Sequence, residues 1–198
     1  MNEDYVRVPQ ISTSSKSGPL CVVGSWVIVL ILGAQIAWGN MSTYICSYFY
    51  HYGNDIEGAT MAKFYVVQPL IVFTSLFFFP IGMHISAQYN PKLVLAVSGL
   101  ITFSSVWISS CTLNPQVFIY LYGLGFGVGK GLFYSTALQS GISHYPERKG
   151  MVAGLVVCGF GFGGFTWGLL ARYLCNPEDL KPSLLDFNGE SLFSPEVA

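Results

Sequence analysis

Five long stretches of apolar residues alternate with short polar connectors along the chain. Each stretch approaches the roughly 20 helical residues that cross a bilayer core of about 30 Å. All of them are far longer than a buried strand of about 4–8 residues. The pattern therefore predicts an all-α fold, a polytopic membrane helix bundle of five transmembrane helices. The expected spans are Leu20 to Trp38, Phe64 to Ile85, Leu93 to Cys111, Val117 to Leu138 and Met151 to Leu174.

The composition supports a membrane protein rather than a soluble one. Of the 198 residues, 52% are hydrophobic and only 10% are charged, whereas soluble domains carry roughly 25% charged residues. The net charge is -1 without a basic patch, which excludes a nucleic-acid partner. The five cysteines are scattered and form no CxxC pair, so neither a metal site nor a disulfide framework is indicated. The lipid bilayer is the expected surrounding.

The polar ends of the chain and the connectors predict the orientation. The leader, residues 1–19, is long and partly acidic, and the apolar run after it is too long for a signal peptide. We expect a disordered cytoplasmic tail there. Because basic residues favour the cytoplasmic side, the amino terminus is predicted inside and residues 176–198 form an extracytoplasmic tail. The basic residues on the cytoplasmic side would be Arg7, Lys16, Lys92, Arg148 and Lys149.

Two glycine-rich stretches resemble the sequence motifs of nucleotide-binding loops. The stretch GFGFGG fits GxGxxG, but no strand precedes it, as a dinucleotide fold requires. The stretch GVGKG around Lys130 lacks the Ser or Thr of a phosphate loop. No cofactor is therefore expected. In a membrane, small residues four apart let helices approach closely. The expected helix-packing residues are Gly123, Gly127, Gly131, Gly154, Gly159, Gly161 and Gly164.

Lys130 is the one charge in the fourth span. On a helical wheel it lies near Gly123 and Tyr134, opposite a mostly aliphatic stripe that we expect to face lipid. An unpaired lysine in hydrocarbon costs about 2.5–3.5 kcal/mol on insertion scales, and no span contains Asp or Glu. Three interpretations stay open: the ammonium binds an anion, its side chain snorkels to the cytoplasmic end, or it pairs with a segment outside this chain.

The first span offers two further polar side chains. Gln35 and Trp38 share a face at i, i+3 spacing. They either line a cavity, or Gln35 forms a hydrogen bond to a neighbouring helix. The three histidines are far apart at connectors or span ends. The spans thus offer no catalytic residues and no metal ligands, and we do not expect an enzyme.

Three stretches carry a resemblance to a known family. They are GAQIAWGNMSTYICSYF, YGLGFGVGKGLFYS and HYPERKGMVAGLVVCGFGFGGF. They resemble the first, fourth and fifth helices in the amino-terminal half of a major facilitator superfamily transporter. The likeness is to the oxalate/formate-antiporter-like, monocarboxylate-transporter-like branch. It implies a secondary active transporter of small organic anions, by rocking of two bundles around a central site. The substrate-binding residues it implies are Lys130, Tyr134, Trp38 and Gln35.

The chain departs from the family pattern in two ways. Ser86 stands where an aspartate is expected in the loop after the second helix, and only Lys92 remains of the basic residues there. The superfamily has twelve helices in two halves, and five spans make an incomplete six-helix half. Residues 176–198 then resemble the loop before a missing sixth helix. We expect a truncated or partial chain with a missing carboxy-terminal half as partner, or a degenerate paralogue. The rival function is a non-transporting membrane scaffold whose glycine faces bind a partner.

Overall fold

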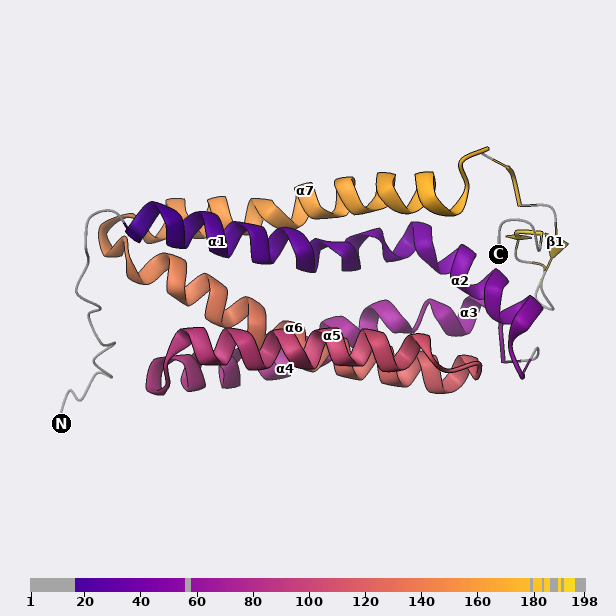
Figure 1. Cartoon of the computed structure of the whole chain (residues 1–198), viewed down its shortest axis with the longest axis horizontal. Coiled ribbons are helices and arrows are strands. Elements are labelled where there is room, and N and C mark those ends of the chain that lie inside the picture. Colours follow the sequence, from indigo (N-terminus) through magenta and orange to yellow (C-terminus); the bar gives the residue numbers. More distant parts are fainter. Residues whose placement is uncertain are drawn as a thin grey trace.

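The computed structural model describes residues 17–55, 58–178, 180–182, 184–185, 189 and 191–194. The described chain forms an elongated bundle whose long helices run along one common axis (Figure 1). Five helical segments are long and apolar enough to cross a membrane. The prediction of an all-α bundle with five spans is therefore confirmed. The expected cytoplasmic tail, residues 1–19, lies almost wholly outside the described residues.

The first span is longer than its apolar run. Helix α1 (Ser17–Leu32), the 3-10 segment η1 (Gly33–Ala37) and helix α2 (Trp38–Tyr52) follow one another without a break. Together residues 18–52 form a 35-residue span, whereas the hydropathy pattern ends at Trp38. The continuation mixes polar and aromatic residues: it buries Ser42, Cys46, Ser47 and Phe49 and exposes Tyr48 and Tyr52. An amphipathic helix of this kind is invisible to a search for apolar runs.

The remaining helices follow with short connectors. They are α3 (Met61–Phe64), α4 (Val67–Gln88), α5 (Pro91–Ser110), α6 (Pro115–Ser143), η2 (Pro146–Arg148) and α7 (Lys149–Cys175). Asn-Pro pairs start both α5 and α6. The Asn90 side chain accepts a hydrogen bond from the Lys92 amide, and Asn114 accepts from Gln116 and Val117. An asparagine cap followed by proline is a favourable helix start.

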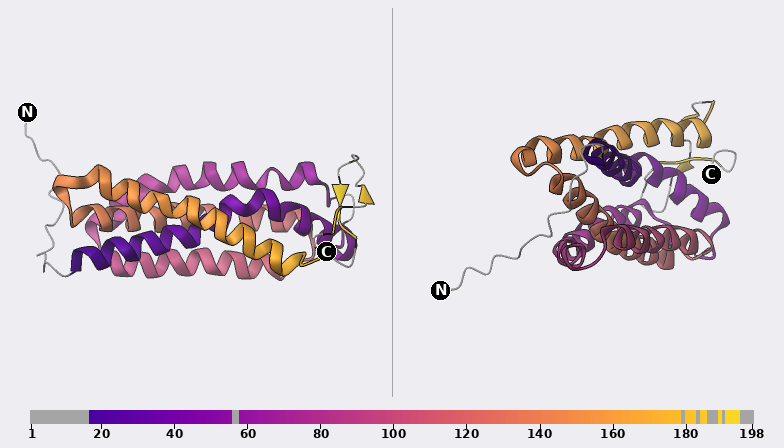
Figure 2. Two further views of the ribbon diagram at one scale, coloured as in Figure 1. Left: turned by 90° about the horizontal axis from the view of Figure 1, so that it is seen from above. Right: turned by 60° about the vertical axis from the view of Figure 1, so that its left-hand side comes forward.

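The helices form two layers. One layer contains α1, η1, α2 and α7, and the other contains α4, α5 and α6 (Figures 1 and 2). Helix α6 packs against both α4 and α5, while α7 packs along α1 and η1. Contacts from α6 to α1 and α7 join the layers. Helix α6, which carries Lys130, is thus the central element of the bundle.

Glycines bring α6 into backbone contact with α4. A Cβ atom added at Gly131 would lie 2.7 Å from the Ser75 carbonyl oxygen. At Gly127 it would lie 2.7 Å from Cβ of Thr74, and at Gly123 2.6 Å from a methyl group of Leu70. These three glycines, spaced four apart, lie directly against one neighbouring helix. Such close approach is how small residues hold membrane helices together.

The glycines of α7 divide into two groups. A Cβ atom at Gly159 would lie 2.8 Å from the Trp26 carbonyl oxygen, and one at Gly164 would lie 2.8 Å from Ile36. Around Gly154 and Gly161, in contrast, nothing lies within 4 Å of the added atom. The packing role expected for Gly154 and Gly161 therefore has no partner helix among the described residues, and it stays a prediction. These two glycines face away from the other described helices, a direction that residue spacing alone does not determine.

The aliphatic stripe of α6 is also placed differently from the expectation. Lipid was expected to cover the side opposite Lys130, but Ser135 on that side is buried. A Cβ atom at Gly82 of α4 would lie 2.9 Å from Cα of Leu132. The stripe faces protein there because α6 lies between two other helices. Leu124, toward the other end of α6, is exposed.

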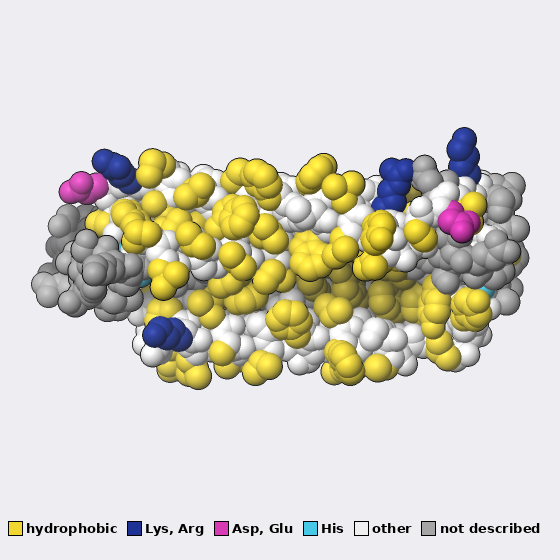
Figure 3. Space-filling view, turned by 45° about the horizontal axis from the view of Figure 1, so that its top comes forward, with side chains coloured by type: hydrophobic (Ala, Val, Ile, Leu, Met, Phe, Trp, Pro, Cys, Tyr) yellow, Lys and Arg dark blue, Asp and Glu magenta, His cyan; other side chains and the backbone are white. Residues whose placement is uncertain are grey.

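The surface matches a lipid environment. Large hydrophobic side chains cover the middle of the bundle, while lysine, arginine and acidic side chains gather at its two ends (Figure 3). Exposed side chains on this surface include Phe73, Phe77, Trp107 and Phe165. In water such a continuous apolar surface would be a strong aggregation site. In a bilayer it is the expected lipid contact.

Part of the segment expected as an extracytoplasmic tail packs back onto the bundle. Strands β1 (Leu184–Leu185) and β2 (Ser191–Leu192) pair antiparallel. The Phe193 amide donates to Ser47 Oγ at 2.9 Å, and the Phe193 carbonyl lies 3.1 Å from His51 Nε2. The ring of Phe193 stacks on Tyr44 with 4.6 Å between centroids. These contacts fix the end of the described chain to α2.

Candidate substrate site

Lys130 lies near the middle of α6, which has 29 residues. At 1.5 Å rise per residue, either end of the helix is about 20 Å away. The ammonium does not extend toward an end. Its Nζ atom donates a hydrogen bond to Gln35 Oε1 in the other layer. This geometry contradicts the snorkelling interpretation, since the charged group points into the bundle at mid-height.

Gln35 reaches Lys130 at the point where the first span changes from α-helix to 3-10 helix. The residue lies in η1 and is 3% exposed. A mid-helix 3-10 stretch often marks a functional position. The opposite side of η1 is pressed against α7, where a Cβ atom at Gly33 would lie 2.7 Å from Cα of Gly163. The Lys130–Gln35 hydrogen bond therefore joins the two layers at the level where η1 and α7 are in backbone contact.

Tyr134 joins this group through a residue that was not predicted. The Phe160 ring of α7 lies with its centroid 5.5 Å from Lys130 Nζ, within cation–π range. The same ring meets Tyr134 edge-on at 5.1 Å, and Tyr134 also contacts Phe79 of α4 at 5.5 Å. Phe160 stands among glycines in the sequence. That context allows close approach of α7 but does not say which way the ring points.

The indole ring of Trp38 contacts other aromatic residues than the Lys130 group does. Its indole N–H donates to the Phe64 carbonyl oxygen at 3.3 Å, and its ring stacks on Tyr122 at 5.2 Å and on Phe118 at 6.3 Å. The backbone N–H of Trp38 donates to the Gln35 carbonyl oxygen, and Tyr134 and Phe160 pack against the hydrophobic core that contains Trp38. The structure therefore brings Lys130, Gln35 and Tyr134 together around Phe160, whereas the side chain of Trp38 contacts Phe64, Tyr122 and Phe118.

The groups that contact the Lys130 ammonium are uncharged. No Asp or Glu lies in the described long helices α1, α2, α4, α5, α6 and α7 or in η1, and the contacts of the ammonium are an amide oxygen and an aromatic face. A lysine ammonium has three donors, and Gln35 accepts one of them. The remaining positive charge and donors are suited to an anionic oxygen ligand. The interpretation that Lys130 pairs with a segment outside the chain is not tested by these contacts.

Ser86 occupies the position where the resemblance expects an aspartate. It is buried at the end of α4, and its hydroxyl is hydrogen bonded to Gln139 Oε1 of α6. A neutral contact between α4 and α6 therefore stands at this position. The charged gate contact of the family pattern has no carboxylate here.

Comparison with known proteins gives low-identity relatives of one kind. No family model matches the chain, and no solved structure matches it. The apicoplast pyruvate carrier 1 of Toxoplasma gondii is 24% identical over 84% of this chain and 36% of its own length. Monocarboxylate transporter 14 of Mus musculus is 26% identical over 76% of this chain and 28% of its own.

A further relative is monocarboxylate transporter 12-B of Danio rerio, which is 22% identical over 88% of this chain and 37% of its own length. This chain thus spans about a third of the length of the relatives it matches. The relatives are named as transporters or carriers and not as enzymes. The chain is a multi-pass membrane protein whose relatives are monocarboxylate transporters and a pyruvate carrier, which confirms its resemblance to a monocarboxylate-transporter-like half of the major facilitator superfamily.

Proposed function

We propose that the chain takes part in secondary active transport of small organic anions, with monocarboxylates as the substrate class and oxalate or formate as related candidates. One observation carries the proposal: a lysine near the middle of α6 is turned into the bundle and contacts a neutral amide and an aromatic ring. The names of the relatives, monocarboxylate transporters and a pyruvate carrier, agree with this chemistry.

In the proposed site each group has a separate role. Lys130 attracts the substrate carboxylate, and Gln35 positions the ammonium through their hydrogen bond. Tyr134 and Phe160 form an aromatic wall beside the charge. Trp38 supports the wall from the aromatic core, through its packing on Tyr122 and Phe118.

The proposed transport path needs a second bundle. Substrate sites in transporters of this kind lie near the bilayer midplane between two repeats, and the described helices form one bundle. We propose that further helices, from a carboxy-terminal half or another chain, close the site on its open side. The orientation with the amino terminus in the cytoplasm remains part of the proposal. Coupling is to protons or to a counter-anion.

The test is direct ligand binding to the whole chain in nanodiscs. Pyruvate, lactate, formate and oxalate are expected to raise the unfolding temperature in a saturable manner, because a ligand that binds only the folded state stabilises it. Glycerol, which is small and polar but uncharged, is the control. The proposal is wrong if the anions and glycerol have the same effect at equal concentration.

Two substitutions of Gln35 distinguish the effect of the Lys130 charge on binding from the effect of the Lys130–Gln35 hydrogen bond. Gln35→Glu places a carboxylate beside the ammonium, and we expect pyruvate affinity to fall about tenfold because the internal carboxylate competes for Lys130. Gln35→Leu is the matched control and removes the amide without neutralising the lysine. The leucine variant is expected to lose less affinity than the glutamate variant, because its ammonium keeps its full charge although the amide no longer positions it. Titration of both variants checks this, and a greater loss with leucine than with glutamate would contradict it.

The rival scaffold function also has an observation in its favour. Gly154 and Gly161 form a surface of α7 with no neighbour in the described bundle, and glycine surfaces accept partner helices. The scaffold proposal expects a stable partner in detergent pull-downs and no stabilisation by any carboxylate. The nanodisc titration therefore distinguishes the two proposals.

A further inference from the structure

One face of α7 contacts the 3-10 segment η1, which presents Gln35 to Lys130. Phe160, Gly163 and Trp167 follow one another at i, i+3 and i+7 on that helix, so they lie along one face. The Phe160 ring lies over the Lys130 ammonium, and Gly163 is in backbone contact with η1. Trp167, the third residue of this face, contacts the first span just before η1 begins.

The indole of Trp167 binds a backbone carbonyl of α1. Its N–H donates to the Leu30 carbonyl oxygen at 3.1 Å, and a Cβ atom at Gly163 would overlap the same oxygen. Helix α1 ends at Leu32, and η1 begins at the next residue. Leu30 therefore lies in the last turn of α1, where carbonyl groups lose their usual amide partners. The Trp167 indole supplies a donor at this point, and the carbonyl satisfies the indole N–H inside the bilayer.

A second indole holds the other end of η1. Trp38 is the first residue of α2 and follows η1 directly. Its N–H donates to the carbonyl oxygen of Phe64, the last residue of α3, at 3.3 Å. The segment Gly33–Ala37 therefore lies between two indole–carbonyl hydrogen bonds, one to α7 and one to α3.

These two hydrogen bonds resist a change in the winding of η1. A 3-10 helix has poorer hydrogen-bond geometry than an α-helix, and each of its residues advances by about 120° rather than about 100°. If the five residues of η1 rewound into α-helix, α2 would turn against α1 by about 100°, and the span would shorten by about 2.5 Å. Gln35, the third residue of η1, would turn by about 60° and lose its contact with Lys130.

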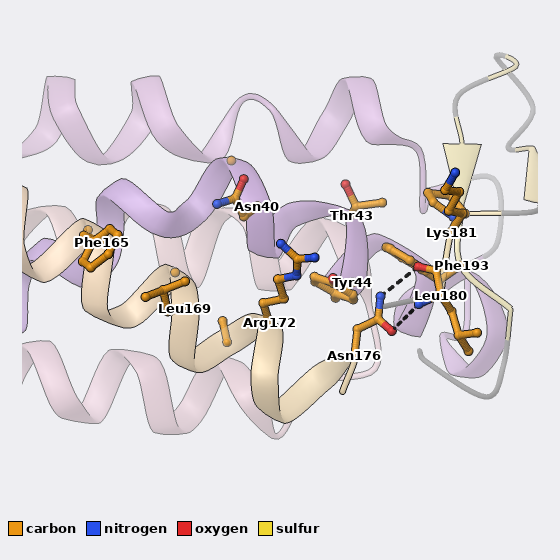
Figure 4. A pocket seen from close by; sticks show the side chains of 15 residues that line it. Asn40, Thr43, Tyr44, Phe165, Leu169, Arg172, Asn176, Leu180, Lys181 and Phe193 are labelled. Carbon is orange, nitrogen blue, oxygen red and sulfur yellow. Dashed lines mark hydrogen bonds between the residues drawn. The ribbon is translucent and has the colours of Figure 1, made fainter. Parts of the chain in front are cut away.

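The close packing of α7 against the first span ends just past η1. A Cβ atom added at Gly168, the residue after Trp167, would lie 3.7 Å from Asn40 Nδ2 and 3.9 Å from Cβ of Ala37, which is ordinary contact. Farther along, α2 and α7 border a cavity of about 600 Å³, with Asn40 on one side and Leu169 on the other (Figure 4). The last close contacts between α7 and the first span are therefore those at η1.

We propose that Trp167 is a positioning residue of the substrate site. Through the Leu30 carbonyl it holds η1 in its 3-10 winding, and this winding keeps Gln35 in contact with Lys130. Trp38 holds the same segment from its other end. The inference rests on the proposed function where it concerns substrate, whereas the contact between Gln35 and Lys130 can be measured without any substrate.

Chemical cross-linking measures this contact in the whole chain in nanodiscs. In a Gln35→Glu background the introduced carboxylate lies beside the Lys130 amine, and a membrane-permeant carbodiimide joins the two in an amide bond that mass spectrometry identifies. Adding Trp167→Phe removes the indole N–H. We expect the rate of cross-linking to fall at least about threefold, because the lost hydrogen bond favours rewinding of η1.

Trp107→Phe in the same background is the matched control. Trp107 is 74% exposed on the lipid-facing surface of α5, and its replacement should leave the cross-linking rate unchanged. A tryptophan isostere with sulfur in place of the indole N–H, incorporated at position 167, removes only the donor and serves if Trp167→Phe does not fold. The inference is overturned if the change at position 167 and Trp107→Phe give the same rate.

Pyruvate binding in the same nanodiscs is the second readout. Trp167→Phe is expected to weaken it about threefold, and Trp107→Phe to leave it unchanged. In a Gln35→Leu background, Trp167→Phe should have no further effect, because Trp167 acts through Gln35. A loss of equal size in both backgrounds would show that Trp167 acts on the fold as a whole and would overturn its positioning role.

The two readouts distinguish this inference from the proposed function. If no anion binds to the wild type, the proposed function fails, and the cross-linking comparison alone decides whether Trp167 holds Gln35 against Lys130. If pyruvate binds but Trp167→Phe does not change the cross-linking rate, the proposed function stands and the role of Trp167 is wrong.

Discussion

Replacement of Lys130 by alanine is expected to weaken pyruvate binding by at least about 100-fold, since a hydrogen bond to a charged group contributes about 1.5–3 kcal/mol and the substrate also loses its counter-charge. The stability of the folded state is not expected to decrease. Removal of the ammonium also removes an insertion cost of about 2.5–3.5 kcal/mol. The variant should therefore fold with wild-type helicity while losing its ligand.

Binding to nanodisc-embedded protein and far-UV circular dichroism measure these two properties. Lys92→Ala is the control, because this exposed lysine at the start of α5 is remote from Gln35 and Phe160 in the fold. Lys130→Arg keeps the charge and should retain part of the affinity. If the alanine variant binds pyruvate with wild-type affinity, Lys130 does not bind the substrate and the proposed site is wrong.

Gly163→Leu is expected to have the largest effect on folding. A Cβ atom at this position would overlap the Leu30 carbonyl oxygen and lie 2.9 Å from Cα of Gly33. Both neighbours are backbone atoms, so neither can rotate away. Overpacking typically costs about 1–3 kcal/mol, occasionally more, and we expect more than that range here because four carbons are added against rigid atoms. The contact of α7 with α1 and η1 should open.

Gly161→Leu is the matched control for this change. It lies two residues away on the same helix, and nothing is within 4 Å of an added Cβ atom. Thermal unfolding in detergent should therefore show a large loss for Gly163→Leu and little change for Gly161→Leu. If both variants unfold at the same temperature, the described contact between α7 and η1 is wrong.

The sequence determines the number of spans better than their ends. Apolar runs identified all five spans because hydropathy depends only on local composition. The ends of the helices differ from the ends of the apolar runs where something other than hydropathy determines the helix end. The Asn90 and Asn114 caps start α5 and α6 slightly earlier than the apolar runs, and the amphipathic residues after Trp38 extend the first span.

The candidate site was predicted in part, for a related reason. A helical wheel places Lys130 and Tyr134 on one side of α6, but it contains no information on how many helices surround α6. The lipid contact expected for the aliphatic stripe opposite Lys130 was wrong at Leu132, because α4 covers that side. Phe160 was missed because its role depends on the rotation of α7. That rotation follows from contacts of Gly159 and Gly163 with distant residues.

The length of the first span has a consequence for the shape of the protein in its bilayer. Its 35 residues extend over about 50 Å at the helical rise, whereas the hydrocarbon core is about 30 Å thick. The surplus must stand in the headgroup layer and the water beyond it. Exposed Tyr48 and Tyr52 near the end of α2 suit that boundary, where tyrosine is enriched. A solute that approaches from this side therefore meets the end of α2 before it reaches the lipid hydrocarbon.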